Sequence, residues 1–325
     1  MICRSCLKEN KEGFCVKCRK ELFDGKKVST ALVFDSPFAN TSGEFLDHTK
    51  KISISGVQVK YSLKMESNEL QLTETGGQYI LKPIPTGTFR HLDQAPANEH
   101  LTMQIARQVF KLNIPPNALF FFNDGSPAYL VRRFDQTTDK KLQQEDFAQI
   151  AQMTSETHGE HYKYDLSYEE IAQLIRQYIP TYRIEMEKFF RLILFNYIFS
   201  NGDAHLKNFS AIQSEQGDYV LTPAYDLLCT KLHSPSESDL ALSLFKDGFT
   251  NTYEAYGFYT YQDFLEFGQH IGIKESRVKQ IIQEFANPKD GIQQLIDKSF
   301  LNDELKQTYK AYLEDKVKRL NMISA

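Results

Sequence analysis

The hydrophobic pattern of this chain changes its period near residue 140, and this change limits the folds that the chain can adopt. Before that point apolar and polar residues alternate, as in strands, over residues 52–64, 78–82, 118–122 and 128–134. Residues 98–112 form a helical stripe, with Asn98 as its expected N-cap. The first part of the chain is therefore predicted to be a small lobe of strands and one helix.

After residue 140 the apolar residues recur at the spacing of amphipathic helices. Residues 183–200 are apolar on nearly every side, which predicts a helix at the centre of a second lobe. The other predicted helices cover residues 145–153, 167–179, 261–271, 275–285 and 303–320. The whole pattern predicts an α+β fold of two lobes. The expected domains are a cysteine module at 1–28, a linker at 29–50, a mixed β/α N-lobe at 51–135 and a mostly helical C-lobe at 136–325.

The composition is that of an ordinary globular protein, and it argues against two classes of partner. The net charge is −4, and Lys and Arg are scattered along the chain, so no footprint for DNA or RNA is expected. The most apolar stretch, residues 189–200, falls short of the ~20 residues needed to cross a bilayer. The first residues lack the apolar segment of a secretory signal. We therefore expect a cytoplasmic protein that binds neither nucleic acid nor membrane.

Four of the five cysteines lie within the first eighteen residues. Cys3 and Cys6 form one C-x₂-C pair, and Cys15 and Cys18 form the second, which is the ligand count and pairing of a small Cys₄ zinc knuckle. A disulfide framework is not expected in a reducing compartment. The alternative is four free thiols that have lost their metal. Cys229 stands among apolar residues and is expected to be a buried hydrophobe.

The most polar loop of the chain directly follows the helix predicted at residues 183–200. It contains Asp203 and, five residues later, Asn208, which is the Asp-x₄-Asn spacing of kinase catalytic loops. An aspartate can accept the proton of an attacking hydroxyl, and an asparagine oxygen can bind Mg²⁺ beside the transferred phosphoryl group. Gly202 is expected to cap the preceding helix with a positive φ. Taken alone, these residues also fit a simple polar turn.

A second carboxylate, Asp226, follows a predicted strand pair over residues 208–213 and 218–221, with the turn at Gly217. Kinases bind a metal ion through an aspartate in this part of the chain. By itself Asp226 would be an exposed acid at the end of a strand. Its combination with the Asp-x₄-Asn loop favours a metal site.

Groups that bind the nucleotide are expected in the first lobe. Lys82 lies on a predicted strand and Glu99 at the start of the predicted helix, which matches the Lys–Glu pair that positions phosphates in kinases. Lys60 is a second candidate cation, and residues 53–60 offer backbone N–H groups and hydroxyls as an anion nest. Residues 131–133 would meet adenine at an interlobe hinge, although the two arginines there also fit a solvated surface pair.

These segments together resemble the HipA-like serine/threonine kinases of bacterial toxin–antitoxin systems. The resemblance covers about residues 50–322 and rests on six segments in order, at residues 53–60, 80–83, 98–99, 131–135, 201–209 and 223–226. It implies the HipA-like, protein-kinase-like fold with ATP between the two lobes. Full-length HipA has an additional N-terminal subdomain where this chain has its cysteine module. The chain is therefore most similar to the short form of the family, HipT.

The resemblance also implies the site residues. Asp203 would be the catalytic base, and Asn208 and Asp226 would hold Mg²⁺. Besides these last two, the implied nucleotide contacts are Ser55, Gly56, Val57, Gln58, Val59, Lys60, Lys82, Glu99, Val131, Arg132, Arg133, His205, Leu206, Lys207, Tyr225, Leu227 and Leu228. Ser53 and Ser55 would be autophosphorylated, which would add about −1.5 to −2 charges per phosphate beside ATP. The alternative is that both hydroxyls only make local hydrogen bonds.

Cofactors and partners follow from the same resemblance. ATP and Mg²⁺ would be the cofactors, and a structural Zn²⁺ in the cysteine module would have no role in phosphoryl transfer. The substrate would be a protein, which is an aminoacyl-tRNA synthetase for known members of the family. A small HipS-like protein and a HipB-like DNA-binding antitoxin would neutralise the kinase. Two alternatives stay open, namely a small-molecule phosphotransferase of the aminoglycoside type and an inactive kinase fold that acts as a binding component.

Overall fold

The computed structural model describes residues 1–37, 59–137, 140–287 and 290–322. The chain forms two compact units. The first contains residues 1–136, 232–234 and 290–306, and the second contains residues 137–231, 235–289 and 307–325. The chain passes from the first unit to the second after residue 136, one residue from the limit expected between the N-lobe and the C-lobe at residue 135. The other expected limits remain predictions about which segments fold independently.

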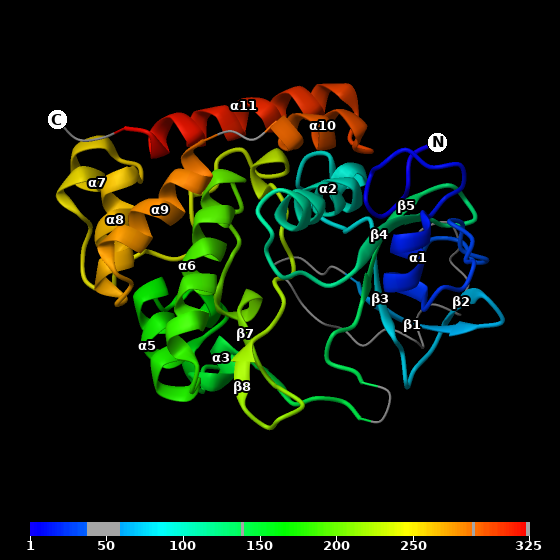
Figure 1. Ribbon diagram of the computed structural model, residues 1–325, viewed down its shortest axis with the longest axis horizontal. Coiled ribbons are helices and arrows are strands. Elements are labelled where there is room, and N and C mark those ends of the chain that lie inside the picture. Colours follow the sequence, from blue (N-terminus) through cyan, green and yellow to red (C-terminus); the bar gives the residue numbers. More distant parts are fainter. Residues whose placement is uncertain (38–58, 138–139, 288–289, 323–325) are drawn as a thin grey trace. The chain divides into compact units, whose positions relative to one another are not determined.

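A five-stranded antiparallel sheet organises the first unit, with the strands in the order β2-β1-β3-β5-β4 (Figure 1). The strands are β1 (Tyr61–Glu66), β2 (Glu69–Leu72), β3 (Tyr79–Pro83), β4 (Asn117–Phe121) and β5 (Pro127–Arg132). The strands predicted at residues 78–82, 118–122 and 128–134 are confirmed within one or two residues. Successive side chains of a strand point to opposite faces, so each strand contributes to two different surfaces.

The two faces of this sheet have different partners. One face includes Leu81, Phe120 and Leu130, and it shares a buried core with the cysteine segment and with α1 (Val16–Phe23). The opposite face carries Lys82 and packs against α2 (Ala95–Gln108). Residues 28–34, where the linker is expected to begin, also contribute Val28, Leu32 and Phe34 to the first core. The cysteine segment is thus built into the core of the first unit.

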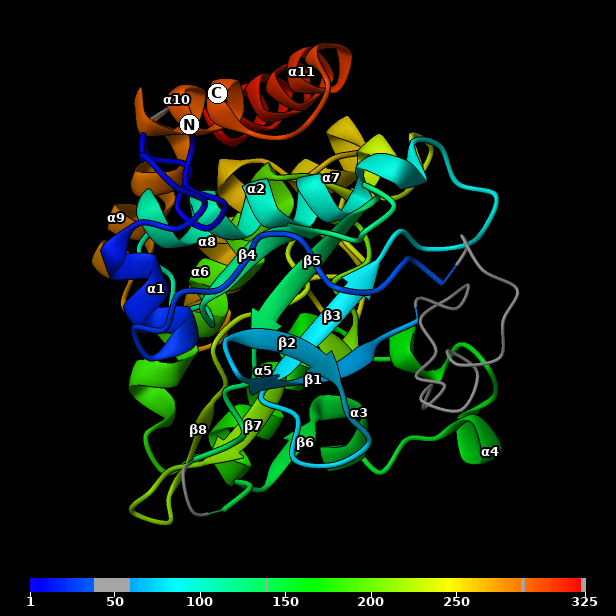
Figure 2. The same cartoon turned by 90° about the vertical axis from the view of Figure 1, so that its right-hand side faces the viewer.

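Helix α2 begins three residues earlier than predicted. Pro96 lies in its first turn, where a missing N–H is tolerated because no helical partner exists for it. Asn98 is therefore not the N-cap, and its buried amide lies 2.9 Å from Nε2 of His233. A helix that was not predicted, α10 (Asp290–Lys298), packs against α2 (Figure 2).

The second unit is mainly helical, and α6 (Tyr182–Ile198) forms its core, with Phe189, Phe190, Ile193 and Leu194 completely buried. Its other helices are α3 (Phe147–Ile150), α4 (Ser155–His158), α5 (Tyr168–Tyr178), α7 (Asn251–Tyr256), α8 (Tyr261–His270), α9 (Glu275–Ala286) and most of α11 (Asp303–Leu320). No helix in the described part of the chain is long and apolar enough to cross a membrane.

A small antiparallel sheet of β6 (Gln144–Asp146), β7 (Ser210–Gln213) and β8 (Tyr219–Leu221) completes this unit. It confirms the predicted strand pair, and Gly217 has a φ of 95° at the turn. Residues 145–153 do not form one helix as predicted. They begin as β6 and continue as the single turn of α3, because Asp146 forms a capping box that starts a new helix at Phe147. Short 3₁₀ turns cover Leu92–Gln94, Tyr162–Tyr164, Leu206–Asn208 and Thr230–Leu232.

Candidate active site

The structure brings the predicted Lys–Glu pair together inside the first unit. Nζ of Lys82 on β3 lies 2.6 Å from Oε1 of Glu99 on α2, and the two side chains are only 5% and 4% exposed. The ammonium group also lies 5.5 Å from the ring centre of Tyr129, the residue that pairs with Lys82 across β3 and β5. Burial excludes the solvent that would screen these charges, so removing either one would leave the other in an apolar setting.

The predicted phosphate loop is only partly described. Val59 packs against the core of the first unit, and Lys60 is half-buried. The remaining residues of the loop that carry predictions lie outside the described residues: Ser53, Ser55, Gly56, Val57 and Gln58.

Residues 131–133, the predicted hinge, are engaged within the first unit. The N–H of Arg132 donates to the Pro116 carbonyl and the N–H of Arg133 to the Gln78 carbonyl, both at 2.9 Å. The Arg132 guanidinium pairs with Asp24, and that of Arg133 pairs with Asp135. Two of the N–H groups that a hinge would offer to adenine are therefore already bonded within the protein.

The polar loop after α6 starts with a left-handed residue, but that residue is not the predicted one. Ser200 has a φ of 51°, whereas Gly202 does not have a positive φ. The prediction for Gly202 is therefore wrong, and the reason for glycine is close packing. A Cβ atom at Gly202 would lie 2.5 Å from the carbonyl oxygen of Ser238 and 2.8 Å from Cδ of Glu237. Any larger side chain would push the loop away from this neighbouring segment.

Asp203 is oriented by a segment that precedes α5. The hydroxyl of Tyr164 donates a hydrogen bond to Oδ1 of Asp203 at 2.5 Å. Burial raises the pKa of Asp203 above its usual value, with a contribution from the charge of Asp226, although the Tyr164 hydrogen bond and the nearby Lys163 oppose this rise. A carboxylate with a raised pKa and a fixed orientation is suited to act as a general base near neutral pH.

Asn208 and Asp226 lie side by side within the second unit. Nδ2 of Asn208 is 3.4 Å from Oδ2 of Asp226, and Oδ1 of Asn208 accepts a hydrogen bond from the His205 N–H at 3.1 Å. Asp226 has a φ of 55°, a conformation that costs a residue other than glycine of order 1–3 kcal/mol and is common at functional sites. A carboxylate and an amide carry the oxygen atoms that Mg²⁺ prefers as ligands, and in this structure the amide faces the carboxylate with its nitrogen.

Tyr225 connects the two chain segments that carry these ligands. Its hydroxyl donates to the carbonyl oxygen of Lys207 at 2.9 Å and lies 2.5 Å from Oγ of Ser210. Burial raises the pKa of Tyr225, so the phenol remains protonated and can donate. This contact fixes the Asp226 segment against the loop that carries Asn208.

The other predicted residues of this loop are buried to different degrees. His205 is buried with its ring centre 5.3 Å from that of Tyr164, and burial lowers its pKa to about 3, so the imidazole is neutral. Lys207 is half-buried, with Nζ 3.4 Å from the Tyr162 hydroxyl. Leu206 and Leu227 are buried and Leu228 is half-buried. The two buried leucines thus belong to the core beneath the loop.

Sequence reasoning missed the residues that support Asp203. Tyr164 and Lys163 lie in a polar stretch without helical or strand periodicity, so nothing in the pattern connects them to a site thirty-nine residues later. Thr230 and Glu237 were also missed. The Gly202 N–H donates to Oγ1 of Thr230 at 2.8 Å, and the Thr230 hydroxyl donates to Glu237.

Glu237 is expected to make the stability of the second unit depend on pH. Burial raises its pKa to about 7, so the native state binds this proton more tightly than the unfolded state does. Stability is therefore lost as the pH rises from the unfolded pKa toward about 7. Glu237→Gln should raise the free energy of unfolding by roughly 2–3 kcal/mol at pH 8 and by little at pH 4. Chemical denaturation at both pH values measures this difference, and an equal gain at both would exclude titration of Glu237 as its cause.

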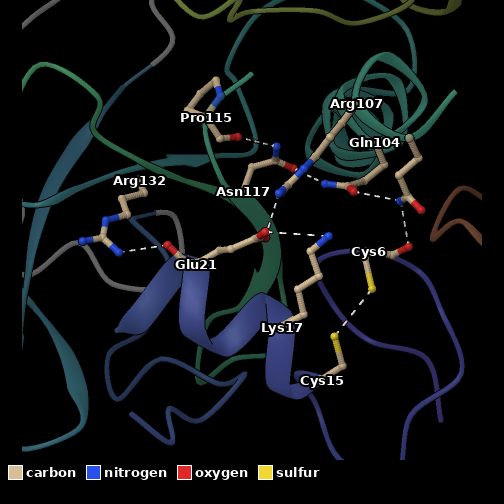
Figure 3. Close-up of polar contacts among 10 residues, drawn as sticks. Cys6, Cys15, Lys17, Glu21, Gln104, Arg107, Pro115, Asn117 and Arg132 are labelled. Atoms are coloured by element: carbon tan, nitrogen blue, oxygen red, sulfur yellow. Dashed lines mark hydrogen bonds and ion pairs between the residues drawn. The ribbon is translucent and has the colours of Figure 1, made fainter. Parts of the chain in front are cut away.

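The four N-terminal cysteines form a second site, of which Figure 3 shows Cys6 and Cys15. Their sulfur atoms all lie within 4.8 Å of one another, and Sγ of Cys6 and Sγ of Cys15 are 3.8 Å apart. In a tetrahedral site with Zn–S bonds of about 2.3 Å, the sulfur atoms lie about 3.8 Å apart. A disulfide would need an S–S distance of about 2.05 Å. The cluster therefore has the dimensions of a Cys₄ metal site, while Cys229 is a buried residue of the second unit, as predicted.

The backbone around these cysteines turns sharply and directs one N–H group at a sulfur atom. Leu7, directly after Cys6, has a φ of 61°, and the Cys15 N–H donates to Sγ of Cys3 at 3.3 Å. Cys15 is the N-cap of α1 and Cys18 lies in its first turn, where the helix dipole favours negative charge. Hydrogen bonds from Cys18 and Cys6 hold the pKa of the Cys3 thiol well below its usual value, and the bond to Cys3 raises the pKa of Cys18. Without a cation, the contacts among the four thiols favour the ionised form of one of them. A bound cation would favour the thiolate form of all four.

Comparison with known proteins identifies the class. Residues 52–290 match the HipA-like C-terminal domain, and the chain belongs to this family. It is 30% identical over 267 residues to a Haemophilus influenzae protein named "Putative kinase", with 77% of this chain and 76% of that protein covered. It is 23% identical over 263 residues to the serine/threonine-protein kinase toxin HipA of Shewanella oneidensis, with 74% of this chain and 59% of that protein covered.

Two solved structures show the same fold. HipA of Shewanella oneidensis, in its complex with HipB and operator DNA, superimposes with a TM-score of 0.62 at 19% identity and covers 88% of this chain and 68% of its own. The Helicobacter pylori proinflammatory kinase CtkA superimposes with a TM-score of 0.52 at 15% identity and covers 81% of this chain and 90% of its own. These likenesses confirm the predicted α+β, HipA-like and kinase-like fold.

Proposed function

We propose that this protein is an ATP- and Mg²⁺-dependent serine/threonine protein kinase that acts as the toxin of a type II toxin–antitoxin system. The observation that carries this proposal is the cluster of Asp203, Asn208 and Asp226, three side chains of suitable chemistry held together within the second unit. The buried Lys82–Glu99 pair and the kinases among the related proteins support it.

In this reaction Asp203 accepts the proton of a serine or threonine hydroxyl, whose oxygen attacks the γ-phosphorus while the bond to ADP breaks. Asn208 and Asp226 would hold Mg²⁺, which would supply positive charge to the phosphates when bound. Lys82, positioned by Glu99, binds the α- and β-phosphates. The other nucleotide contacts implied by the family resemblance belong to the same proposal.

Incubation with labelled ATP, Mg²⁺ and a bacterial lysate, with Asp203→Ala as control, tests the activity and the substrate class together. The proposal expects label on a polypeptide, and an aminoacyl-tRNA synthetase is the expected substrate. Label on a small metabolite would instead indicate an aminoglycoside-type phosphotransferase, and no label above the control would indicate an inactive binding component.

The expected partners also belong to this proposal. The related HipA of Shewanella oneidensis was solved with HipB and operator DNA, which supports a HipB-like antitoxin here. A HipS-like neutralising protein follows from the similarity to the short form, HipT. A cytoplasmic location fits both partners.

Autophosphorylation is expected on Ser53, Ser55 or both, because the short form carries this pair before Gly56. The added phosphate would repel the phosphates of ATP and weaken nucleotide binding. Intact mass and peptide mapping should find phosphate on active protein and none on Asp203→Ala. Phosphate on the inactive variant expressed alone would point to a second kinase, and unmodified active protein would end the proposal of self-regulation.

One Zn²⁺ per chain is expected at Cys3, Cys6, Cys15 and Cys18. Four cysteine sulfur atoms that all lie within 4.8 Å of one another fit zinc better than the harder Mg²⁺ or Ca²⁺, which prefer oxygen ligands. Elemental analysis of protein purified without chelators should give a zinc-to-protein ratio close to one. The ratio should fall toward zero in Cys6→Ser, and metal-free protein from a zinc-supplemented culture would contradict the assignment.

A further inference from the structure

The turn that carries the first cysteine pair contacts α2 through its own backbone. The carbonyl oxygen of Ser5 lies 2.8 Å from Nε2 of His100, and the carbonyl oxygen of Cys6 accepts a hydrogen bond from Nε2 of Gln108 at 2.9 Å. His100 is completely buried and directly follows Glu99 in α2. The conformation of the turn is therefore coupled to the helix that presents Glu99 to Lys82.

Helix α1, which carries Cys18, makes a second connection. Its Glu21 accepts a hydrogen bond at 2.7 Å from the Arg107 guanidinium of α2 (Figure 3). The carbonyl oxygen of the same Glu21 accepts from Arg132 of β5 at 2.9 Å. Because β5 pairs with β3, the second cysteine pair is coupled to the strand that carries Lys82.

The segment around the cysteines also covers part of the β4 edge of the sheet. The N–H of Leu119 on β4 donates to the carbonyl oxygen of Arg4 at 3.0 Å, and the Arg4 guanidinium lies 4.6 Å from the ring centre of Phe121. Two rings of this segment pack on Phe120: the ring centre of Phe14 lies 5.5 Å from that of Phe120, and the ring centre of Phe23 lies 6.2 Å from it. Residues 1–24 thus contact one face of the sheet, its β4 edge, and the helix α2 that covers the other face.

We infer that the metal ion held by the four cysteines is a clamp that fixes α2 against the sheet and thereby positions the Lys82–Glu99 pair. Residues 1–24 contain one regular helix of eight residues, and so short a helix is not stable alone in water. Segments this small usually need a metal or a disulfide to keep a fixed conformation. Without the metal, the Ser5 and Cys6 carbonyl groups would lose the positions at which His100 and Gln108 reach them. The ion is then a positioning element of the kinase, which revises the expectation that it has no role in phosphoryl transfer.

The test compares full-length protein in three states: as isolated with zinc, after removal of zinc by a chelator, and after zinc is added back. Hydrogen exchange of the α2 and β3 amides and the melting temperature are read in each state, together with the zinc content. Cys6→Ser serves as a metal-site variant because Cys6 is half-buried, and Val16→Ser, an exposed neighbour of Cys15, is its control. We expect metal loss to speed exchange in α2 at least about tenfold and to lower the melting temperature by roughly 10 °C, with recovery on zinc addition.

A second variant separates the clamp from the ion itself. Arg107→Ala combined with Gln108→Ala removes two side-chain bonds between α2 and the cysteine segment without touching a ligand. It should keep its zinc and still show faster exchange in α2, while Asn113→Ala, a change at an exposed position in the loop after the helix, should not.

The metal site, the clamp and the kinase activity are each contradicted by a different outcome. Absence of zinc from the isolated protein would overturn the metal site. Zinc removal that leaves α2 exchange and melting unchanged would overturn the clamp while the metal and kinase proposals stand. The clamp proposal rests on the proposed kinase function only where it concerns activity. A zinc-loaded protein without kinase activity would contradict the proposed function, and the hydrogen-exchange result would then decide whether the metal fixes α2.

Discussion

Replacing Asp203 with Asn is expected to lower the rate of phosphoryl transfer by about 10²–10⁴-fold, while the affinity for MgATP changes no more than a few-fold. The amide keeps the shape of the side chain and can still contact Tyr164, but it cannot accept the proton of the substrate hydroxyl. Single-turnover rates and nucleotide titrations separate the two effects. Near-normal transfer by Asp203→Asn would remove the catalytic assignment.

Asp226→Asn is the matched comparison, because it changes the same chemistry at a proposed metal ligand. It should weaken MgATP binding as well as transfer, since a neutral amide binds Mg²⁺ less well than a carboxylate does. The pH profile adds a further check. The raised pKa of Asp203 predicts that the transfer rate of the wild type falls as the pH drops through that pKa, because only the ionised carboxylate acts as a base.

The second large effect is expected at the buried pair of the first unit. Lys82→Ala should lower the free energy of unfolding by about 3–5 kcal/mol, because it leaves the Glu99 carboxylate buried beside an uncharged side chain. The chain has no tryptophan, so circular dichroism in a denaturant titration is the suitable measurement. Nucleotide affinity should fall as well, since Lys82 is the proposed phosphate ligand.

A double variant distinguishes the two roles of this pair. Lys82→Met with Glu99→Leu removes both charges and fills their space with apolar groups, so it should recover most of the lost stability. It should not recover nucleotide binding or transfer, because the cation is still missing. Recovery of activity together with stability would show that the pair is structural only.

The fold was predictable because its signal is periodic and local. The strand at residues 78–82 and the helix at 303–320 appear within a residue of their predicted limits, since alternation and helical spacing each determine an element without long-range information. The start of α2 and the short strand β6 were mispredicted. A proline in the first turn accompanies the earlier start of α2, and a capping box at Asp146 separates β6 from α3. The sequence offers several possible start signals of similar strength at each place, so the boundary could not be chosen from sequence alone.

The central residues of the site were predictable by their spacing, but their supports were not. Asp203 and Asn208 carry the kinase spacing, whereas Tyr164 contacts Asp203 only because the chain folds back over thirty-nine residues. The left-handed backbone of Asp226 was likewise not predicted: aspartate adopts a positive φ more often than most residues, but only a small minority of aspartates do so, and the residue type alone does not mark this position. The cysteine pairs predicted a metal ligand set, and the contacts of their loop with His100 and Gln108 depend on tertiary packing alone.

The most direct test of the active-site assignment is a crystal structure with a non-hydrolysable ATP analogue and Mn²⁺, in which anomalous scattering locates the metal. The assignment predicts a manganese peak about 2.1 Å from oxygen atoms of Asn208 and Asp226, with the γ-phosphate facing Asp203. A metal and triphosphate bound elsewhere, with these three side chains unchanged, would contradict it.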